Sequence, residues 1–447
     1  MAKTLTAKML LARYVRRSDR VLLVNPPVHD ARYAWIHWNQ PLDLLKIGPF
    51  LKKEIGCTVA LLDFMKPEKG GDVPQQRLPG DRQSRTIGEG QFAERYPTWR
   101  FGHDYEEIPK WIAAQKTREH PTQVWITSLC SYWFQSIAQV CVRLRQHFRD
   151  VQIVLIGNYP RMIPDHAVEQ CPADLAVTRP LPIDGIPMDL GLYGKACPPF
   201  AAIMPHTKCA VAEVRAAVSR GVTDFAFFSE DLLSDGGQAL WEIVRKTEHL
   251  HRHIKYHVIC GLYPQLITPK TAKILAHKRF ADLHFEETST NYAVDVPVYE
   301  AAITYLREAG LTIPSRAVSG FVWIGRPRET LETIIQNMIA LLRALGTFIL
   351  KPFTPTPGSP EHSQNADYLA RIPSHEDWSP HLFPFAELNG IARADYHDLY
   401  RLAAFLNDKV RGQSFDFLAG TLGLDFLKSS LQREVWRIGS TALRTTD

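Results

Sequence analysis

The sequence predicts an α/β protein, with a doubly wound parallel sheet followed by a partial β/α barrel and a small helical C-terminal cap. Short apolar runs alternate with segments of helical periodicity along most of the chain. These runs are continuously apolar, as in strands covered on both faces by helices. A stretch rich in Pro and Gly at 179–194 divides two series of such units. At 447 residues, the chain is long enough for about three domains.

The first series predicts a Rossmann-like doubly wound sheet, whose ligand crevice lies at the carboxyl ends of its strands. The expected strands are the apolar runs at 21–25, 58–64, 124–130, 151–157 and 173–178. Helical spacing is found at 42–54, and a second helix is expected after the third strand, through about 148. Residues 66–122 contain many Pro, Gly and charged residues and are expected to form a long irregular excursion.

The second series predicts a partial (β/α)6 barrel of the TIM type, with its site at the carboxyl rim. Strands are expected at 224–229, 254–260, 282–287, 317–325 and 347–353. Helices are expected near 207–220, 236–251, 269–278, 298–309 and 329–345. The resulting domains are a basic arm at 1–19, a first domain at 20–185, a barrel at 186–365 and a helical C-terminal domain at 366–447.

The charge of the protein lies in its N-terminal arm. The formal net charge is +5, and the first twenty residues carry six basic side chains against one acidic one. The rest of the chain is therefore neutral, which argues against nucleic-acid binding as its main function. No apolar run is long enough to span a bilayer or to serve as a signal-peptide core. The seven scattered cysteines are expected to be reduced thiols, and the protein is expected to be cytoplasmic.

Several motifs, in order along the chain, resemble the cobalamin (B12)-binding radical S-adenosylmethionine (SAM) family. The first half carries NPP at 25–27, LLDF at 61–64, SYW at 131–133 and LIGNYP at 155–160. The second half carries FFSEDLL at 227–233, LHFEETS at 283–289, FVWIGRPRET at 321–330 and FTPTPGSP at 353–360. The resemblance covers about residues 20–365. It implies a B12-binding-type domain followed by a radical-SAM-like barrel.

The family's cluster motif is missing from this chain. Members of the family open the barrel with CxxxCxxC, whose three thiolates hold a [4Fe-4S] cluster that binds and cleaves SAM. At the matching place Cys197 resembles the first cysteine, but the next two ligand positions fall on Ala201 and Met204. Cys209 is expected inside the first barrel helix. Since neither Ala nor Met supplies a thiolate, no cluster is expected, and Cys197 is interpreted as the relic of the motif.

Cobalamin is one cofactor that the resemblance implies. The Asp-x-His-x-x-Gly motif of many B12 domains does not occur here, although B12-dependent radical SAM enzymes commonly lack it too. The aromatic loop after the first strand would overlook the upper face of the corrin or be buried against the barrel. The second glycine expected in the turn after the fourth strand is replaced by Asn158, and Tyr159 would crowd the slot for the nucleotide tail. The cobalamin candidates are Asn25, Pro26, Pro27, Trp35, Trp38, Ser128, Tyr132, Gly157, Asn158 and Tyr159.

SAM is the second cofactor that the resemblance implies. The candidates for contacting an adenosyl ligand lie at predicted strand ends: Glu230, Asp231, Glu287, Thr288, Ser289 and Gly325. Glu230 and Asp231 are equally compatible with an acidic helix cap. Arg326 and Arg328 add positive charge after Gly325, which suits an anionic ligand, an acidic partner or a solvated turn. The alternate spacing of His249, His251, His253 and His257 at a helix-to-strand junction does not favour a metal site.

Taken together, these features predict a degenerate family member that acts as a non-catalytic or accessory protein. It would bind cobalamin, a substrate or an active radical SAM relative as its partner. The alternatives are a cobalamin-dependent methyltransferase that works without radical initiation, and a radical SAM methyltransferase with an atypical cluster site. The substrate is not indicated by any motif.

Overall fold

The computed structural model describes the residues that build two parallel sheets and their helices. These residues are 11, 13–31, 40–66, 82–87, 94–114, 120–181, 183, 185–194, 197–229, 232–287, 292–313, 315, 317–355, 357, 359–370, 391, 395–396, 399–400, 402–403 and 406–407. Two compact units are present: Met1–Ile203 with Thr207–Asp224 and Pro355–Leu382, and Met204–His206 with Phe225–Thr354 and Phe383–Asp447. The predicted α/β class is confirmed. β9 (Phe200–Ile203) and α7 (Ala210–Val218) belong to the first unit, beyond the boundary expected at 185.

The first unit contains a five-stranded parallel sheet, and all five strands expected there are present. Their order is β3 (Thr58–Asp63), β1 (Arg20–Asn25), β6 (Gln123–Ser128), β7 (Gln152–Gly157) and β8 (Leu175–Ala176). The chain steps from β1 to β3 on one side and continues from β6 on the other. This reversal places a switch point at the carboxyl ends of β1 and β6, where doubly wound sheets bind their ligands.

Helices cover both faces of the first sheet, because each strand is apolar on both sides. On one face, Leu23 of β1 packs with Ile47 of α2 (Leu42–Phe50), which continues as a π-helical segment at Leu51–Ile55. On the other face, Val24 packs with Val140 of α4. The helices on this second face are α3 (Glu107–Ala114), α4 (Phe134–His147), α5 (Asn158–Met162) and α6 (Pro164–Gln170).

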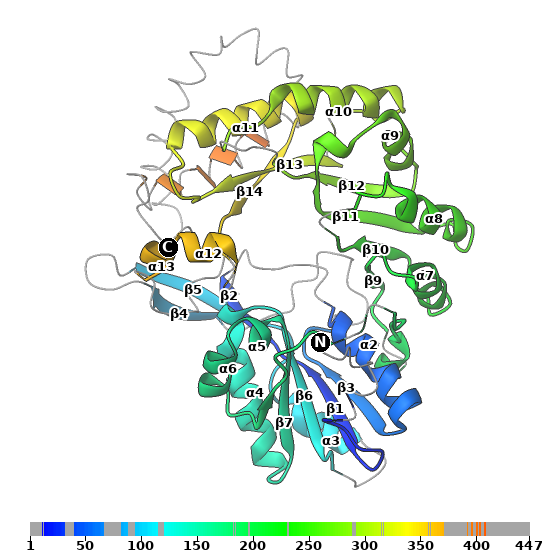
Figure 1. The fold of residues 1–447 in the computed structure, drawn as a ribbon, viewed down its shortest axis with the longest axis vertical. Coiled ribbons are helices and arrows are strands. Elements are labelled where there is room, and N and C mark those ends of the chain that lie inside the picture. The colour runs from blue at the N-terminus through cyan, green and yellow to red at the C-terminus, as the bar shows by residue number, and fades with distance from the viewer. Residues whose placement is uncertain are drawn as a thin grey trace, which may run out of the picture. The chain divides into compact units, whose positions relative to one another are not determined.

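The sequence predicted a long irregular excursion at 66–122. The structure shows instead that part of this segment is regular. It contains α3 and two strands, β4 (Arg82–Ile87) and β5 (Glu94–Phe101). They form a small antiparallel sheet with β2 (Val28–Ala31), in the order β2-β5-β4. Since only two residues separate the end of β1 from the start of β2, this sheet lies at the carboxyl edge of the first sheet (Figure 1).

The second sheet has six strands in the order β14-β13-β12-β11-β10-β9. Their bounds are β14 (Phe348–Pro352), β13 (Val318–Ile324), β12 (Phe280–Phe285), β11 (Lys255–Leu262), β10 (Asp224–Phe227) and the edge strand β9. Strands β11 to β14 pair in parallel. The five expected strands are confirmed, whereas β9 was not expected.

Side-chain caps start three of the helices that follow strands of the second sheet. Thr268 and Thr271 form a capping box at α9 (Pro269–Leu275). Asp295 caps α10 (Val296–Glu308), and Thr330 caps α11 (Leu331–Leu345). The other helices of the described chain are α8 (Gln238–Thr247), α12 (Pro360–Gln364), α13 (Ala366–Leu369) and short 3-10 turns at Ser131–Trp133, Leu190–Tyr193 and Pro264–Leu266. Most of the expected C-terminal cap lies outside the described residues.

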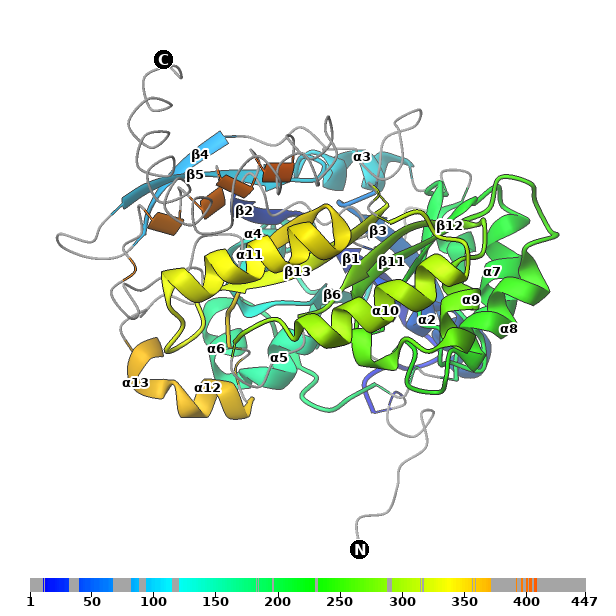
Figure 2. The same ribbon diagram turned by 90° about the horizontal axis from the view of Figure 1, so that it is seen from above.

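The two faces of the second sheet differ in chemistry. Both views place α10 and α11 along one face (Figures 1 and 2). A Cβ on Gly320 of β13 would lie 2.8 Å from a methyl of Leu341, so the missing side chain lets α11 approach closely. We call the opposite side the polar face, because it carries His257, Asp282, His284, Ser319, Phe321, Trp323 and Lys351. No helix among the described residues is long and apolar enough to cross a membrane.

Candidate functional site

At the carboxyl edge of the first sheet, polar groups bind one another. Asn25 and Asp63, which end the paired strands β1 and β3, are joined by a 2.7 Å hydrogen bond from Asn25 Nδ2 to Asp63 Oδ1. The hydroxyl of Tyr193 donates to Asp63 Oδ2 at 2.7 Å, and the backbone N–H of Met65 donates to Oδ1 at 2.9 Å. Burial raises the pKa of Asp63, and burial beside that carboxylate raises the pKa of Tyr193. Asn25, one of the cobalamin candidates, is therefore already hydrogen-bonded to Asp63.

The turn after β7 is shaped by close backbone packing. Gly157 has φ of +97°, and a Cβ there would lie 2.4 Å from the carbonyl oxygen of Ser128, at the end of β6. Glycine is required here by the neighbouring strand, whatever else binds nearby. The Ser128 hydroxyl donates to the carbonyl of Cys130 at 3.3 Å. Thr127 donates to Asp43 at the start of α2, so α2 is tied to the end of β6.

The other cobalamin candidates do not form one surface. Pro26 and Pro27 are buried after β1, and Asn158 is exposed at the start of α5. Tyr159 does not crowd the turn, because its ring is fully buried in the core and its hydroxyl lies 2.6 Å from Nδ1 of His166. Tyr132 is half-buried and contacts the edge of the Trp133 ring. Trp35 and Trp38 lie outside the described residues.

Apolar side chains cover the ends of the central strands. Val28, Met65 and Trp133, which follow β1, β3 and β6, form a cluster with Phe101 at the end of β5. Each of these four side chains is less than 10% exposed. With Asn25, Asp63 and Tyr193 also bonded to one another, the edge is closed by the chain's own groups. These residues do not fit a corrin lying on the ends of β1 and β6.

The cysteines do not surround a common point. Cys197 precedes β9 and so lies at its amino end, whereas Cys209 follows its carboxyl end as the N-cap residue of α7. Cys209 is thus at the helix start and not inside the helix. Ala201 is fully buried within β9. No group of three His, Cys, Asp or Glu side chains among the described residues could hold a metal ion. The donors present do not fit an iron–sulfur cluster.

A buried ion network lies at the carboxyl ends of β12 and β13. Arg326 Nη2 lies 2.8 Å from Glu287 Oε1 and 2.8 Å from Glu329 Oε1, and both glutamate side chains are 0% exposed. The backbone N–H of Trp323 donates to Glu287 Oε2 at 2.9 Å. Asn337 of α11 donates to the carbonyl of Tyr292 at 2.7 Å. Glu287 is therefore an interior group of this network and is shielded from a ligand.

Arg326 is not in a solvated turn, and it is not presented to an anionic ligand or partner. Its guanidinium donates hydrogen bonds to the two glutamates and lies 4.6 Å from the centre of the Tyr292 ring. Burial raises the pKa values of Glu287 and Glu329, while Arg326 opposes the rise. Gly325 (φ of +83°) donates its N–H to Glu329 Oε2 at 2.9 Å. Arg328 is exposed and keeps a left-handed backbone, with φ of +66°.

Glu286, the residue before Glu287, lies on the polar face. It was not among the residues predicted from the sequence. Glu286 accepts a hydrogen bond from the indole N–H of Trp323, and Lys351 Nζ lies 3.2 Å from its Oε2. A Cβ on Gly261 would lie 2.6 Å from the Cβ of Glu286, so glycine makes room for this side chain. The alternation Leu283, His284, Phe285, Glu286 was the available signal, since it puts Glu286 on the side of His284.

Two histidine pairs continue the polar face across β11, β12 and β13. His257 Nδ1 lies 2.9 Å from Asp282 Oδ2, and His284 Nδ1 lies 2.6 Å from the Ser319 hydroxyl. Burial lowers the pKa of His284, and nearby Asp282 partly opposes this shift. The neutral imidazole can therefore exchange a hydrogen bond with Ser319 at pH 7. The remaining SAM candidates Glu230, Asp231, Thr288 and Ser289 lie outside the described residues.

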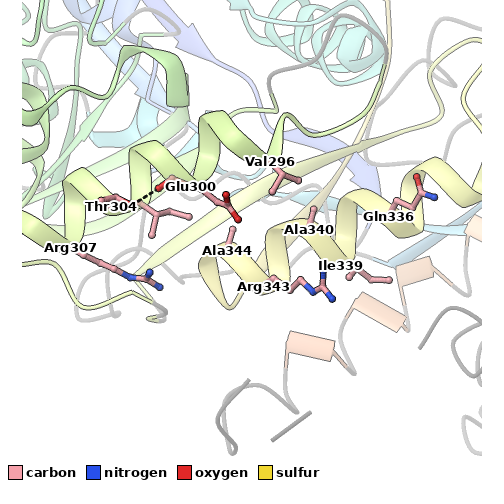
Figure 3. A pocket seen from close by; sticks show the side chains of 10 residues that line it. Val296, Glu300, Thr304, Arg307, Gln336, Ile339, Ala340, Arg343 and Ala344 are labelled. Atoms are coloured by element: carbon pink, nitrogen blue, oxygen red, sulfur yellow. Dashed lines mark hydrogen bonds between the residues drawn. The ribbon is translucent and has the colours of Figure 1, made fainter. Parts of the chain in front are cut away.

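A separate groove lies between α10 and α11 (Figure 3). Its volume is about 570 Å³, and its walls combine Ile303, Ile339 and Ala340 with Glu300 and Arg343. None of the residues expected from the sequence lines it. It lies on the helices that cover the apolar face of the sheet, so it is distinct from the polar face.

Comparison with known proteins gives no family. No family model matches the sequence, and no curated protein matches it. The carboxyl transferase domain of Rhizobium etli pyruvate carboxylase aligns at 10% identity and a TM-score of 0.24, over 94% of this chain and 57% of that one. N-acetyl-D-glucosamine-6-phosphate deacetylase from Mycobacterium smegmatis aligns at 14% identity and a TM-score of 0.16, over 63% and 82%. The catalytic domain of starch synthase IV from Arabidopsis thaliana aligns at 12% identity and a TM-score of 0.20, over 80% of this chain and 73% of that one. Similarity this low carries no functional conclusion.

Proposed function

We propose that this chain is a degenerate relative of the B12-binding radical SAM enzymes, with a Rossmann-like domain and a partial β/α barrel. In this proposal it acts without an iron–sulfur cluster, as a non-catalytic or accessory protein. The strand order β3-β1-β6-β7-β8 supports the first half, since it is the 2-1-3-4-5 order of one common class of doubly wound sheets. The series of strands and helices from β9 to β14 supports the second half.

One observation carries the proposal: the start of the barrel series supplies no set of thiolates, because the positions matched after Cys197 hold Ala201, buried in β9, and Met204. Cys209, which follows β9, brings no second cysteine either, since a glutamate lies four positions after it, at residue 213. That residue is Glu213, whose Oε1 lies 2.9 Å from Lys46 Nζ, with both side chains 1% exposed. The backbone N–H of Met188 also donates to Glu213 Oε1 at 2.9 Å. A buried pair of this kind holds α2 and α7 together and supplies no thiolate.

We place the ligand site of this protein on the polar face of the second sheet. Carboxyl ends of parallel strands are where β/α proteins bind their ligands. Glu286, Trp323 and Lys351 are held there by mutual contacts and are still partly accessible. The first sheet offers no comparable set among its described residues, because its edge is closed by the cluster around Trp133. The ligand is therefore bound through carboxylate, imidazole, ammonium and aromatic groups.

Metal and corrin content test this proposal directly. The full chain is produced with added cobalamin and is also reconstituted anaerobically with iron and sulfide. We expect neither corrin bands in the visible spectrum nor the broad absorption of a cluster. About four irons per chain would overturn the proposal in favour of a radical SAM enzyme. Near-stoichiometric corrin with methyl transfer from methylcobalamin would overturn it in favour of a methyltransferase.

A further inference from the structure

The ammonium group of Lys351 occupies a cation site made by its neighbours. Lys351 Nζ lies 4.2 Å from the centre of the Trp323 ring and 4.6 Å from the centre of the Phe321 ring. Glu286 Oε2 lies 3.2 Å from the same nitrogen. Aromatic faces and a carboxylate around one positive charge are the features of sites that bind ammonium ligands. Here the bound cation is a side chain of the protein itself.

The site is held in place from several directions. Phe321 and Trp323 project to the same side of β13, and Trp323 pairs with Lys351 on β14. The indole N–H of Trp323 fixes Glu286 Oε1, and the buried Tyr299 of α10 donates to the carbonyl of Glu286. The Trp323 ring also packs edge-on against Phe353. The aromatic groups and the carboxylate are thus positioned by contacts other than those with Lys351.

We infer that Lys351 determines the charge of the ligand that the polar face accepts. With its ammonium in the cation site, the face repels ammonium or sulfonium groups and offers N–H donors to a carboxylate, a phosphate or a neutral acceptor. This statement about ligands rests on the proposed function. The existence of the filled cation site rests only on the geometry of Lys351, Phe321, Trp323 and Glu286.

Removing Lys351 and restoring its missing atoms tests the inference. Lys351→Ala removes the side-chain atoms from Cγ to Nζ, which together correspond to n-propylammonium. Propylammonium chloride is therefore the probe, and n-propanol is its neutral counterpart. We expect propylammonium to bind Lys351→Ala about tenfold more tightly than n-propanol does, by ligand-detected NMR. It should also raise the thermal midpoint of this variant alone, because a ligand of the folded state stabilises it.

Two further variants separate the cation site from simple filling of space. Lys351→Met fills the same volume without charge and should not respond to propylammonium. Adding Trp323→Leu to Lys351→Ala should abolish the preference for the cation. Equal responses of wild type, Lys351→Met and Lys351→Ala, or equal binding of n-propanol, would overturn the inference. These readouts do not depend on iron, corrin or a natural ligand, so their failure is distinguishable from failure of the proposed function.

A measurement on the wild-type chain covers the case in which Lys351→Ala does not fold. Acetic anhydride acetylates accessible, uncharged lysine amines, and the modified residues can be identified by mass spectrometry. Lys351 should react about tenfold more slowly than the exposed Lys255 at the start of β11, because Glu286 and the two aromatic rings surround its nitrogen and restrict the approach of the reagent. Equal rates for the two lysines would contradict the filled site.

Discussion

Arg326→Met removes the positive charge that two buried glutamates share. The guanidinium lies 2.8 Å from an oxygen of each, and neither Glu287 nor Glu329 has any exposed side-chain surface. Methionine fills similar volume but leaves both carboxylates without a counter-ion. Breaking a buried pair on one side costs about 3–5 kcal/mol.

Protonation sets the size of this cost at each pH. One proton, taken up by one of the two carboxylates, replaces the lost positive charge, and binding it at pH 7 costs about 3.7 kcal/mol for a glutamate with an unfolded pKa of about 4.3. At pH 5 the same step costs about 1 kcal/mol. Burial already raises the pKa values of Glu287 and Glu329, and the variant loses the group that opposes this rise. A carboxyl with a raised folded pKa contributes stability at low pH and loses it as the pH rises. We therefore expect a loss of about 4 kcal/mol at pH 7 that shrinks by more than half at pH 5.

Urea denaturation followed by circular dichroism at the two pH values measures this loss. The control is the triple variant Glu287→Gln, Arg326→Met, Glu329→Gln, which removes all three charges and should recover most of the stability at pH 7. A loss below about 1 kcal/mol for Arg326→Met at pH 7, or one equal at pH 5 and pH 7, would refute the reasoning.

Three other substitutions probe separate features of the fold by denaturant unfolding. Lys46→Met should cost about 3–5 kcal/mol because it strands Glu213, while adding Glu213→Leu should recover most of that loss; a double variant as unstable as the single one would contradict this. Gly157→Ala should cost about 3 kcal/mol, since the new Cβ meets Ser128 at 2.4 Å in a left-handed backbone, and an unchanged midpoint would count against that clash. Arg328→Gly should stabilise by about 0.5 kcal/mol by relieving a positive φ, which a lower midpoint would disprove.

The regular elements could largely be predicted from the sequence because their apolar runs are local signals. Continuous runs such as those of β1 and β7 mark strands covered on both faces. β9 was missed because four apolar residues before Met-Pro give too short a signal. β4 and β5 were missed because their polar sequences resemble loops, and they are strands only through pairing with each other and with β2.

The candidate site was predicted only in part. The strand-end motif around Glu287 pointed to the correct edge of the second sheet, but Glu287 faces the interior and Glu286 faces the polar side. The alternation of Leu283 and Phe285 with polar neighbours could have assigned these two sides. The burial of Arg326 could not be predicted locally, since one partner, Glu329, is three positions away but the other, Glu287, is 39 positions away in the chain.

By itself, the sequence determined the α/β class, ten of the strands and the absence of a compact cysteine motif, because each follows from neighbouring residue types. Only the tertiary structure decided which polar groups are bonded to one another and which remain accessible to a ligand. Lys46 and Glu213 meet across 167 positions, and Lys351 reaches Glu286 across 65. Charges hidden in a low-dielectric interior must be paired, and the fold alone brings such distant partners together.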